Sequence, residues 1–196
     1  MLGGTLRVLG MDVNRRNMPA IHRRIGVMYQ SGALYGSMTC LQNVQLPIDE
    51  FTKLGRKARR DRAMGLLERV GLADAAGKMP SEISGGMKKR VAIARAMALD
   101  PEILFLDEPS AGLDPITSND LDDLILQIRR DHGTTFVVVT HELPSIFKIA
   151  DRCAMFDKAR HGMIALGSPV ELRDSSTDDF VKRFFAREGR ETAKVA

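Results

Sequence analysis

Short runs of consecutive apolar residues recur along this sequence, separated by longer stretches of mixed polarity. The runs lie at residues 25–29, 103–106, 135–140 and 153–156. They lack the alternation of a strand with one wet face, and the run at 135–140 is rich in β-branched residues. Strands that are apolar on both faces are typical of parallel sheets with helices on either side. The pattern therefore predicts an α/β protein whose largely parallel sheet is covered on both faces.

Apolar residues at helical spacing predict helices between these strands. They lie within residues 63–70, 121–128 and 180–185. Gly71 follows the first stretch and is typical of a residue that ends a helix. Thr117 or Ser118 is placed to cap the start of the second. Asp178 and Asp179 lie at the start of the third predicted helix, where negative charge suits the positive end of a helix dipole.

The distribution of strand and helix signals divides the chain into four parts. From about Cys40 to Pro101 the strand signals vanish and helix signals dominate. We interpret residues 40–100 as a helical subdomain inserted into an α/β core. The core is then formed by residues 1–39 and 101–168, and residues 169–196 form a C-terminal helix and tail.

Composition narrows the class of protein. A hydrophobic share of 44%, a charged share of 28% and a net charge of +4 are ordinary for a globular chain. Six basic residues crowd positions 53–62, a pattern more typical of a solvated helix face than of a nucleic-acid or lipid contact. Two cysteines without a CxxC pair suit a reducing compartment and give no metal–thiolate site. No apolar run approaches the ~20 residues that span a bilayer, and no secretory leader is evident, so a membrane role requires a partner.

Two adjacent carboxylates end one of the predicted strands. Asp107 and Glu108 follow the apolar run 103–106, and ligands of open parallel sheets bind beyond the carboxyl ends of the strands. Asp107 can hold Mg²⁺ through water, while Glu108 can orient or deprotonate an attacking water. An isolated Asp-Glu pair is more often an acidic turn, so the pair gains its meaning from its neighbours.

A glycine turn opens a basic helix at Ser84-Gly85-Gly86. Ser84 is a good N-cap, and the glycines allow a backbone to approach a phosphate closely. The start of the helix directs free N–H groups and positive dipole at an anion. Residues 88–90 are Lys, Lys and Arg, and we expect them to face solvent. Alone the turn is weak evidence, because ordinary turns share its composition.

Gln30 and His141 each close a predicted strand. Taken separately, Gln30 is a polar strand end and His141 a histidine after a strand, and both are usually structural. Their order along the chain changes this reading. Gln30, the turn 84–86, the pair 107–108, the segment 110–114 and His141 occur in the sequence order of the motifs of ATP-binding cassette (ABC) ATPases.

The chain therefore resembles an ABC ATPase, a P-loop NTPase-like α/β core with an inserted helical subdomain. The resemblance implies ATP and Mg²⁺ as cofactors. It makes Ser84, Gly85 and Gly86 the signature that clamps the γ-phosphate held by the opposite subunit. It makes residues 107–108 the Walker B motif, with Asp107 as a metal ligand and Glu108 as the catalytic base.

The same resemblance gives roles to the remaining motif residues. Gln30 becomes the Q-loop glutamine, which contacts Mg²⁺ or water and links to the transmembrane partner. His141 becomes the catalytic switch histidine at the γ-phosphate. Asp114 belongs to the D-loop, residues 110–114, which lies along the dimer interface beside the nucleotide.

The segments 29–34 and 114–117, with Met87 in the signature, resemble the Mla/Mce-type cassettes of bacterial phospholipid trafficking. This implies a homodimer, a transmembrane permease, an Mce-domain substrate-binding protein and no nucleic acid. It also implies a cytoplasmic position, peripheral on the inner face of the bacterial inner membrane through the permease.

The chain contains no G-x-x-x-x-G-K-[ST] phosphate loop. In the family a strand and this loop precede the segment that residues 3–10 resemble. We expect the missing strand to lie in the sheet interior against the Asp107 strand, so that its absence bares apolar edges.

One interpretation is that Met1 is an internal methionine of a truncated ATPase. The alternative is a non-catalytic module that pairs with and regulates a complete cassette. A soluble ABC ATPase of DNA repair or translation is disfavoured, because long coiled coils and a second cassette are absent.

Overall fold

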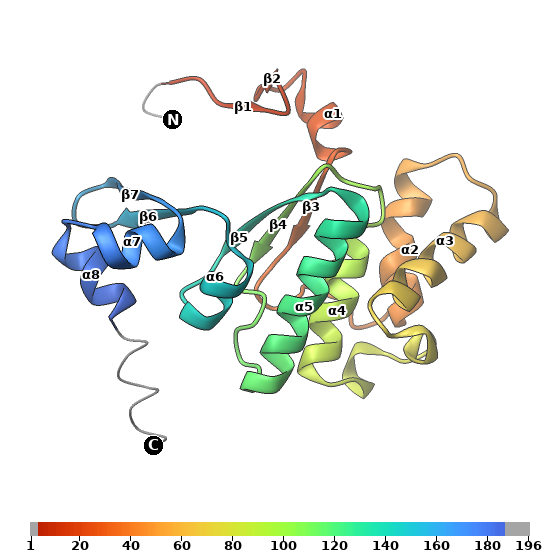
Figure 1. Ribbon diagram of the computed structural model, residues 1–196. Helices are drawn as coiled ribbons and strands as arrows, with labels where there is room; N and C mark the ends of the chain where they lie inside the picture. The colour runs from red at the N-terminus through yellow and green to blue at the C-terminus, as the bar shows by residue number, and fades with distance from the viewer. Residues whose placement is uncertain (1–3, 187–196) are drawn as a thin grey trace. The chain divides into compact units, whose positions relative to one another are not determined.

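Three short parallel strands form the centre of the N-terminal part of the molecule. The structure, a computed structural model, describes residues 4–186, and the chain divides into two compact units, residues 1–139 and 140–196. In the first unit β3 (Ile25–Met28), β4 (Ile103–Asp107) and β5 (Thr135–Val139) lie in the order β3-β4-β5 (Figure 1). The three predicted strands are confirmed to within a residue at each end, and both pairings are parallel.

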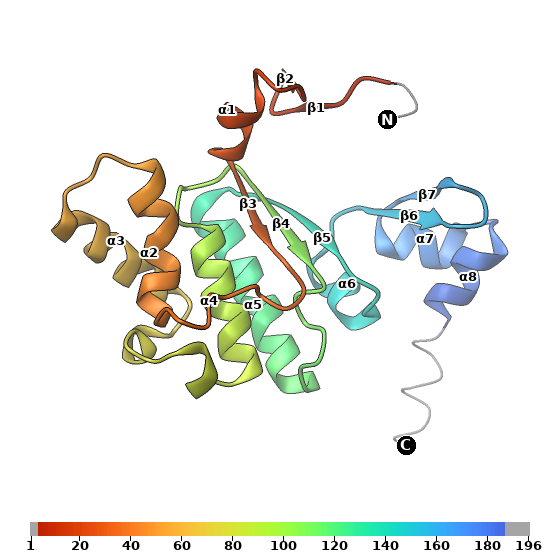
Figure 2. The ribbon, with the colours of Figure 1, turned by 180° about the vertical axis from the view of Figure 1, so that it is seen from behind.

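Two helices cover one face of this sheet. They are α4 (Gly85–Ala96) and α5 (Pro115–His132), both in front of the strands in Figure 1 and behind them in Figure 2. Leu104 and Leu106 point to this side and are at most 1% exposed. At Gly26 a Cβ would lie 2.2 Å from the carbonyl oxygen of Ala96, so β3 and α4 approach closely only because this residue is glycine.

The opposite face of the sheet is open among the described residues of this unit. Val27, Val137 and Val139 alternate with buried or half-buried residues and are 39%, 41% and 59% exposed. The prediction of a sheet covered on both faces is therefore wrong for this unit. The strands are apolar on both faces, as the pattern indicated, but α4 and α5 supply a covering layer on one side alone (Figure 2).

The position of β4 corrects a second expectation. β4 is hydrogen-bonded to β3 on one side and to β5 on the other, with Leu106 opposite both Met28 and Val138. Because both edges of β4 are used, an additional strand can join this sheet only beside β3 or β5. A further strand cannot lie against the Asp107 strand.

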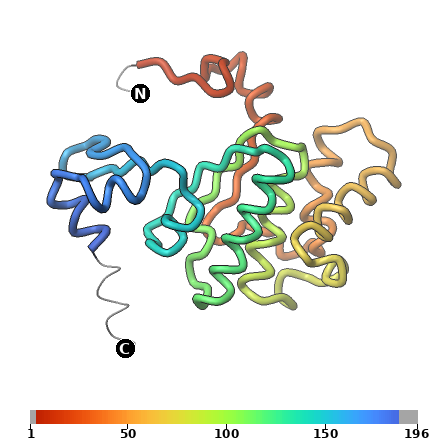
Figure 3. The backbone as a smooth tube through the Cα atoms, in the orientation of Figure 1, coloured from red at the N-terminus to blue at the C-terminus, as the bar shows by residue number. Residues whose placement is uncertain are grey.

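Residues 40–100 are helical wherever they are regular. The segment contains α2 (Cys40–Phe51), α3 (Arg56–Arg69), the short 3₁₀ turns Ala73–Ala75 and Pro80–Glu82, and α4. The helices α2, α3 and α4 pack against one another, and Figure 3 follows the chain out through α2 and α3 and back along α4. The predicted helix over 63–70 is confirmed as part of α3, and Gly71 follows it at φ +72°.

The start of α5 differs from the prediction. The helix begins at Pro115 and its cap is Asp114, whose carboxylate accepts the N–H groups of Ile116 and Thr117. Thr117 and Ser118 lie inside the first turn instead of capping it. An aspartate followed by proline at the first helical position is a stronger start signal than either hydroxyl.

The N-terminal residues add elements that the pattern did not predict. The strands β1 (Arg7–Val8) and β2 (Met11–Asp12) form an antiparallel pair, and α1 (Met18–His22) leads into β3. Within residues 4–186, no helix has both the length and the apolar character that crossing a bilayer requires.

Over its described residues, 140–186, the second unit is a hairpin with three helices. It contains α6 (Leu143–Ile149), β6 (Cys153–Asp157), β7 (Gly162–Gly167), α7 (Pro169–Ser175) and α8 (Asp179–Phe185). Its core joins Leu143 and Ile146 to Leu172, Val181 and Phe185. The predicted strand at 153–156 is confirmed, but it pairs antiparallel with β7 instead of joining the parallel sheet. The predicted helix at 180–185 is confirmed as α8, capped by Asp178.

Candidate functional site

Three of the predicted site residues meet at the carboxyl edge of the parallel sheet. Met28 and Leu106 are opposite each other in the β3–β4 ladder, so Gln30 and the pair Asp107 and Glu108 follow at the same edge. Gln30 and Asp107 are exposed, whereas Glu108 is half-buried. The strand register thus brings together residues that are far apart in the sequence.

Glu108 has an unusual backbone conformation. Its φ of +44° lies in the left-handed region, which residues with a Cβ seldom adopt. The conformation is held on both sides, because its N–H donates to the carbonyl of Val139 at 2.8 Å and its own carbonyl accepts from the N–H of Ala111 at 3.2 Å. Strained backbone of this kind concentrates at functional sites, where it re-aims a side chain.

Lys89 is a site residue whose position the sequence pattern predicts wrongly. It was expected to face solvent, but it is 7% exposed and its ammonium lies beneath the sheet edge. Nζ donates to the main-chain carbonyl of Gln30 at 2.5 Å and to that of Glu108 at 3.1 Å. The signal was available in the spacing: Gly86, Lys89 and Ile93 recur at helical intervals of three and four, and all three are buried.

The start of α4 bears out the predicted cap. Ser84 Oγ accepts the N–H of Met87 at 3.3 Å, and Ser84 and Gly85 are exposed. Gly86 is buried instead, and a Cβ there would lie 2.6 Å from Cγ2 of Thr117. Ser84 and Gly85 can therefore meet a ligand, while the α-carbon of Gly86 faces α5.

Both carboxylate oxygens of Asp114 accept hydrogen bonds from neighbouring residues. Oδ1 accepts the N–H groups of Ile116 and Thr117 at 3.1 and 3.0 Å, and Oδ2 accepts the hydroxyl of Thr117 at 2.5 Å. Hydrogen bonds hold the pKa of Asp114 below the usual range of an aspartate. The largest effect comes from the Thr117 hydroxyl and the next from the Thr117 N–H. Its nucleotide-binding role stays a prediction.

The turn between Glu108 and Asp114 contains a buried hydroxyl. Ser110 is 1% exposed, and its Oγ has no hydrogen-bond partner within the residues that the structure describes. The loop closes on itself through the N–H of Leu113, which donates to the carbonyl of Ser110 at 3.0 Å. This segment is the one whose sequence resembles a D-loop.

His141 lies in the second unit, between Thr140 and the start of α6. Near it, the N–H of Glu142 donates to the hydroxyl of Thr140 at 3.2 Å. The switch role of His141 stays a prediction, because it belongs to a different unit from Gln30, Asp107 and Glu108.

The donors at the sheet edge fit magnesium. Asp107 offers a carboxylate and Gln30 an amide oxygen, and Mg²⁺ takes such oxygen ligands with water and phosphate completing its shell. Across residues 4–186 no three His, Cys, Asp or Glu side chains cluster in a way that could hold a metal. A site of one or two protein ligands and a phosphate is therefore the kind that this edge can form.

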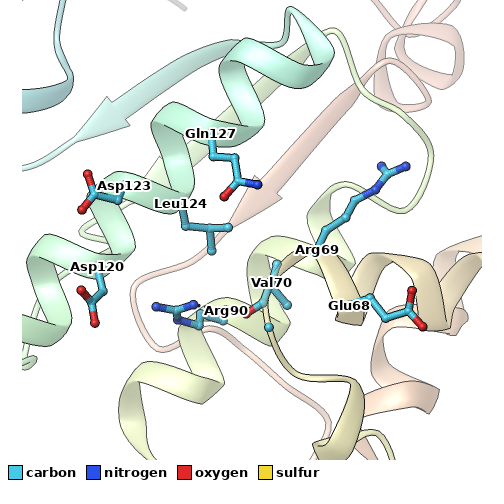
Figure 4. Close-up of a pocket in the computed structure, with 9 residues that line it drawn as sticks. Glu68, Arg69, Val70, Arg90, Asp120, Asp123, Leu124 and Gln127 are labelled. Carbon is cyan, nitrogen blue, oxygen red and sulfur yellow. Dashed lines mark hydrogen bonds between the residues drawn. The ribbon is translucent and has the colours of Figure 1, made fainter.

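A pocket of about 340 Å³ lies elsewhere in the first unit, where the end of α3 faces α4 and α5 (Figure 4). Its lining mixes both signs of charge: Glu68 and Arg69 come from α3, Arg90 from α4, and Asp120 and Asp123 from α5. Arg90 Nη1 donates to the carbonyl of Val70, another lining residue, at 3.3 Å. None of the predicted site residues lines this pocket, so it is separate from the sheet edge.

Comparison with known proteins agrees with this geometry. Residues 2–111 match the family described as ABC transporter. The glutamine transport ATP-binding protein GlnQ of Geobacillus stearothermophilus is 37% identical over 94% of this chain and 76% of its own length. The intermembrane phospholipid transport ATP-binding protein MlaF of Escherichia coli K12 is 39% identical over 88% of this chain. This chain spans 63% of the length of MlaF.

A solved structure shares the fold. The dimeric ATP-binding cassette MJ0796, in a post-hydrolysis state bound to ADP and Pi, superposes with a TM-score of 0.75 at 28% identity. The superposition covers 85% of this chain and 74% of that one. The sheet-edge carboxylates, the capped glycine turn and these matches lead to one conclusion: this chain belongs to the ABC transporter family and has the ABC ATPase fold.

Proposed function

We propose that this chain is the ATP-binding and ATP-hydrolysing subunit of an ABC transporter. The observation that carries the proposal is the convergence of Gln30, Asp107 and Glu108 on the carboxyl edge of adjacent parallel strands. Ligands of open parallel sheets bind beyond this edge. The residue types match phosphoryl transfer, which needs a metal ligand beside a group that positions water.

Each residue at the edge has a distinct part. Asp107 and Gln30 are exposed oxygen donors and would hold Mg²⁺, which neutralises the charge that develops on the phosphates. Glu108 is turned away from the line of β4 by its left-handed backbone, and it would orient the attacking water and accept its proton. His141 would contact the γ-phosphate.

The capped turn of α4 points to a second copy of the chain. Ser84 lies five residues before Lys89, about 7–8 Å further along the helix at ~1.5 Å per residue. Since Lys89 contacts the carbonyl of Glu108, the exposed N–H groups at Ser84 and Gly85 lie beyond the sheet edge. We place them on the nucleotide of a partner copy, in a head-to-tail homodimer, with Asp114 and its loop along the interface.

The cargo that we propose is phospholipid. Its support is the resemblance of segments 29–34 and 114–117 to Mla/Mce-type cassettes and the similarity to MlaF. GlnQ is similar to the same degree, and its name specifies glutamine transport. In this proposal a permease binds the loop after Gln30, an Mce-domain protein delivers the lipid, and the subunit lies on the cytoplasmic face of the inner membrane.

The catalytic part of the proposal is tested on the assembly purified from the native host through a C-terminal tag on this chain. We expect Glu108→Gln to keep 8-azido-ATP photolabelling and to lower the hydrolysis rate by about 10²–10⁴-fold, because a general base contributes that much. Glu102→Gln is the matched control, since Glu102 precedes the same strand at its other end and pairs with Arg24 there. Near wild-type hydrolysis by Glu108→Gln would show that the base assignment is wrong.

The cargo and the partners are tested on the same preparation. We expect mass spectrometry to identify a permease, an Mce-domain protein and bound phospholipid. An amino-acid-binding protein in place of the Mce-domain protein would contradict the lipid cargo. The preparation can instead contain a complete cassette in place of a second copy of this chain. If Glu108→Gln then leaves hydrolysis unchanged, the result favours the alternative that this chain is a non-catalytic module that regulates a complete cassette.

A further inference from the structure

Lys89 connects two parts of the site that lie far apart in the sequence. Its ammonium donates to the carbonyl of Gln30 at 2.5 Å and to the carbonyl of Glu108 at 3.1 Å. The side chain is 7% exposed, so neither contact is exchanged readily for water. Hydrogen bonds from a charged donor are stronger than neutral ones, and burial strengthens them further.

The helix that carries Lys89 holds the Gln30 loop at a second point. Arg95, on the same helix, donates to the carbonyls of Gly32 and Ala33, both at 2.8 Å. Gly32 and Ala33 have φ values of +74° and +46°, so the loop keeps its turn in two left-handed residues. α4 therefore fixes the loop after β3 through two cations.

Besides holding the Gln30 loop, Lys89 contacts Glu108. Lys89 binds the carbonyl of Glu108, and Glu108 has a left-handed backbone with φ of +44°. The N–H of Glu108 is fixed by Val139, and its carbonyl is shared by Lys89 and the N–H of Ala111. The peptide groups on both sides of Glu108 are thus held, which sets the direction of its side chain.

We propose that Lys89 is a positioning residue that couples the Gln30 loop to Glu108 through α4. It acts through the two carbonyls, and a displacement of α4 moves both. A role for this coupling in ATP turnover rests on the proposed function, whereas the coupling itself does not.

The coupling is tested by hydrogen exchange of the full chain without nucleotide. Lys89→Met keeps the length of the stem and removes the charge and the donors. We expect exchange to accelerate together, about tenfold or more, at Gly32 and Ala111, whose N–H groups close the two turns. Lys88→Met is the matched control, because Lys88 is the neighbouring residue on the same helix and is half-buried, whereas Lys89 is buried.

Two further variants keep the test decisive. Lys89→Arg keeps the charge and several donors, and we expect it to restore protection at both amides to within about threefold of wild type. Lys89→Gln serves if the methionine variant fails to fold, and the same joint acceleration is expected. Acceleration at one amide alone, no acceleration, or an equal effect of Lys88→Met would overturn the proposal.

A second readout separates this inference from the proposed function. In the purified assembly we expect Lys89→Met to lower kcat about tenfold or more with KM for ATP within about threefold, because Lys89 positions the base without touching nucleotide. A raised KM with unchanged kcat would overturn the role in turnover. If the wild-type assembly does not hydrolyse ATP, the proposed function fails while the exchange result still decides the coupling.

Discussion

Gly86 is required by the packing of α4 against α5. A Cβ at this position would lie 2.6 Å from Cγ2 of Thr117, closer than side chains approach. We expect Gly86→Ala to lower the free energy of unfolding by about 1–3 kcal/mol, the usual effect of overpacking, in a urea titration. The substitution tests a structural role for a residue that sequence alone assigns to phosphate binding.

Two variants identify the cause of that loss. Gly85→Ala places its Cβ 3.7 Å from Leu113 Cδ2, an ordinary contact, so its free energy of unfolding should stay within about 0.5 kcal/mol of wild type. Thr117→Ser removes the clashing methyl but keeps the hydroxyl that donates to Asp114. In a double-mutant cycle it should recover most of the loss from Gly86→Ala, and additive losses would contradict the clash.

Asp114 makes stability depend on pH. Hydrogen bonds from the Thr117 hydroxyl and N–H hold its pKa below that of an unfolded aspartate, about 3.9. The contribution is therefore complete above the unfolded pKa and is lost as the pH falls through the folded pKa. We expect the wild type to have a higher urea midpoint than Asp114→Asn at pH 7 and the difference to vanish in acid. A difference that stayed constant as the pH was lowered through the acid range would contradict this account.

At the scale of elements, Asn43 anchors α2 to the loop that follows β3. Its side chain is fully buried, accepts the N–H of Tyr35 and donates to the carbonyls of Tyr35, Met38 and Thr39. Replacing it by leucine keeps the volume but leaves these backbone groups unpaired. We expect the free energy of unfolding to fall by about 1–3 kcal/mol in urea.

The control for this prediction lies on the same helix. Gln45 is half-buried and donates to the exposed Asp49, so Gln45→Leu should change the free energy of unfolding by no more than about 0.5 kcal/mol. Equal losses from the two leucine variants would show that the Asn43 network contributes nothing specific.

Elements were predictable where a strong apolar run had clear ends. β4 and β5 followed from their runs alone, whereas the partner of β6 did not. β7 begins and ends in glycine, which weakens its strand signal. The short polar turn between β6 and β7, where Asp157 accepts the N–H groups of Ala159 and Arg160, was the available sign of a hairpin.

At the scale of the whole molecule, the candidate site was predictable as a set of residues but not as an arrangement. Motif order identified Gln30, Asp107 and Glu108, and the parallel register then explains why they meet. Lys89 was missed because a lysine among basic neighbours is normally solvated. Only the packing of α4 beneath the sheet edge shows that its charge lies against two carbonyls.

The open face of the sheet is a property of the described structure with a measurable consequence. Val27, Phe105 and Val137 are opposite one another in register and form an apolar row on this face. Exposed apolar surface of this kind binds hydrophobic dyes and promotes self-association. We expect the full chain to bind anilinonaphthalene sulfonate, and Val137→Thr to lower both the dye fluorescence and the association seen in sedimentation velocity.

The neighbouring residue provides the control, since successive side chains of a strand point to opposite faces. Val138 is opposite Leu106, which is 1% exposed on the covered face. Val137→Thr adds a hydroxyl that water can reach, so the free energy of unfolding should stay within about 0.5 kcal/mol of wild type. Val138→Thr places the same hydroxyl on the covered face, where Val138 is half-buried, and should cost about 1–2 kcal/mol without lowering dye binding. If the two substitutions had the same effects, the two faces would be equally covered, and the open face would be refuted.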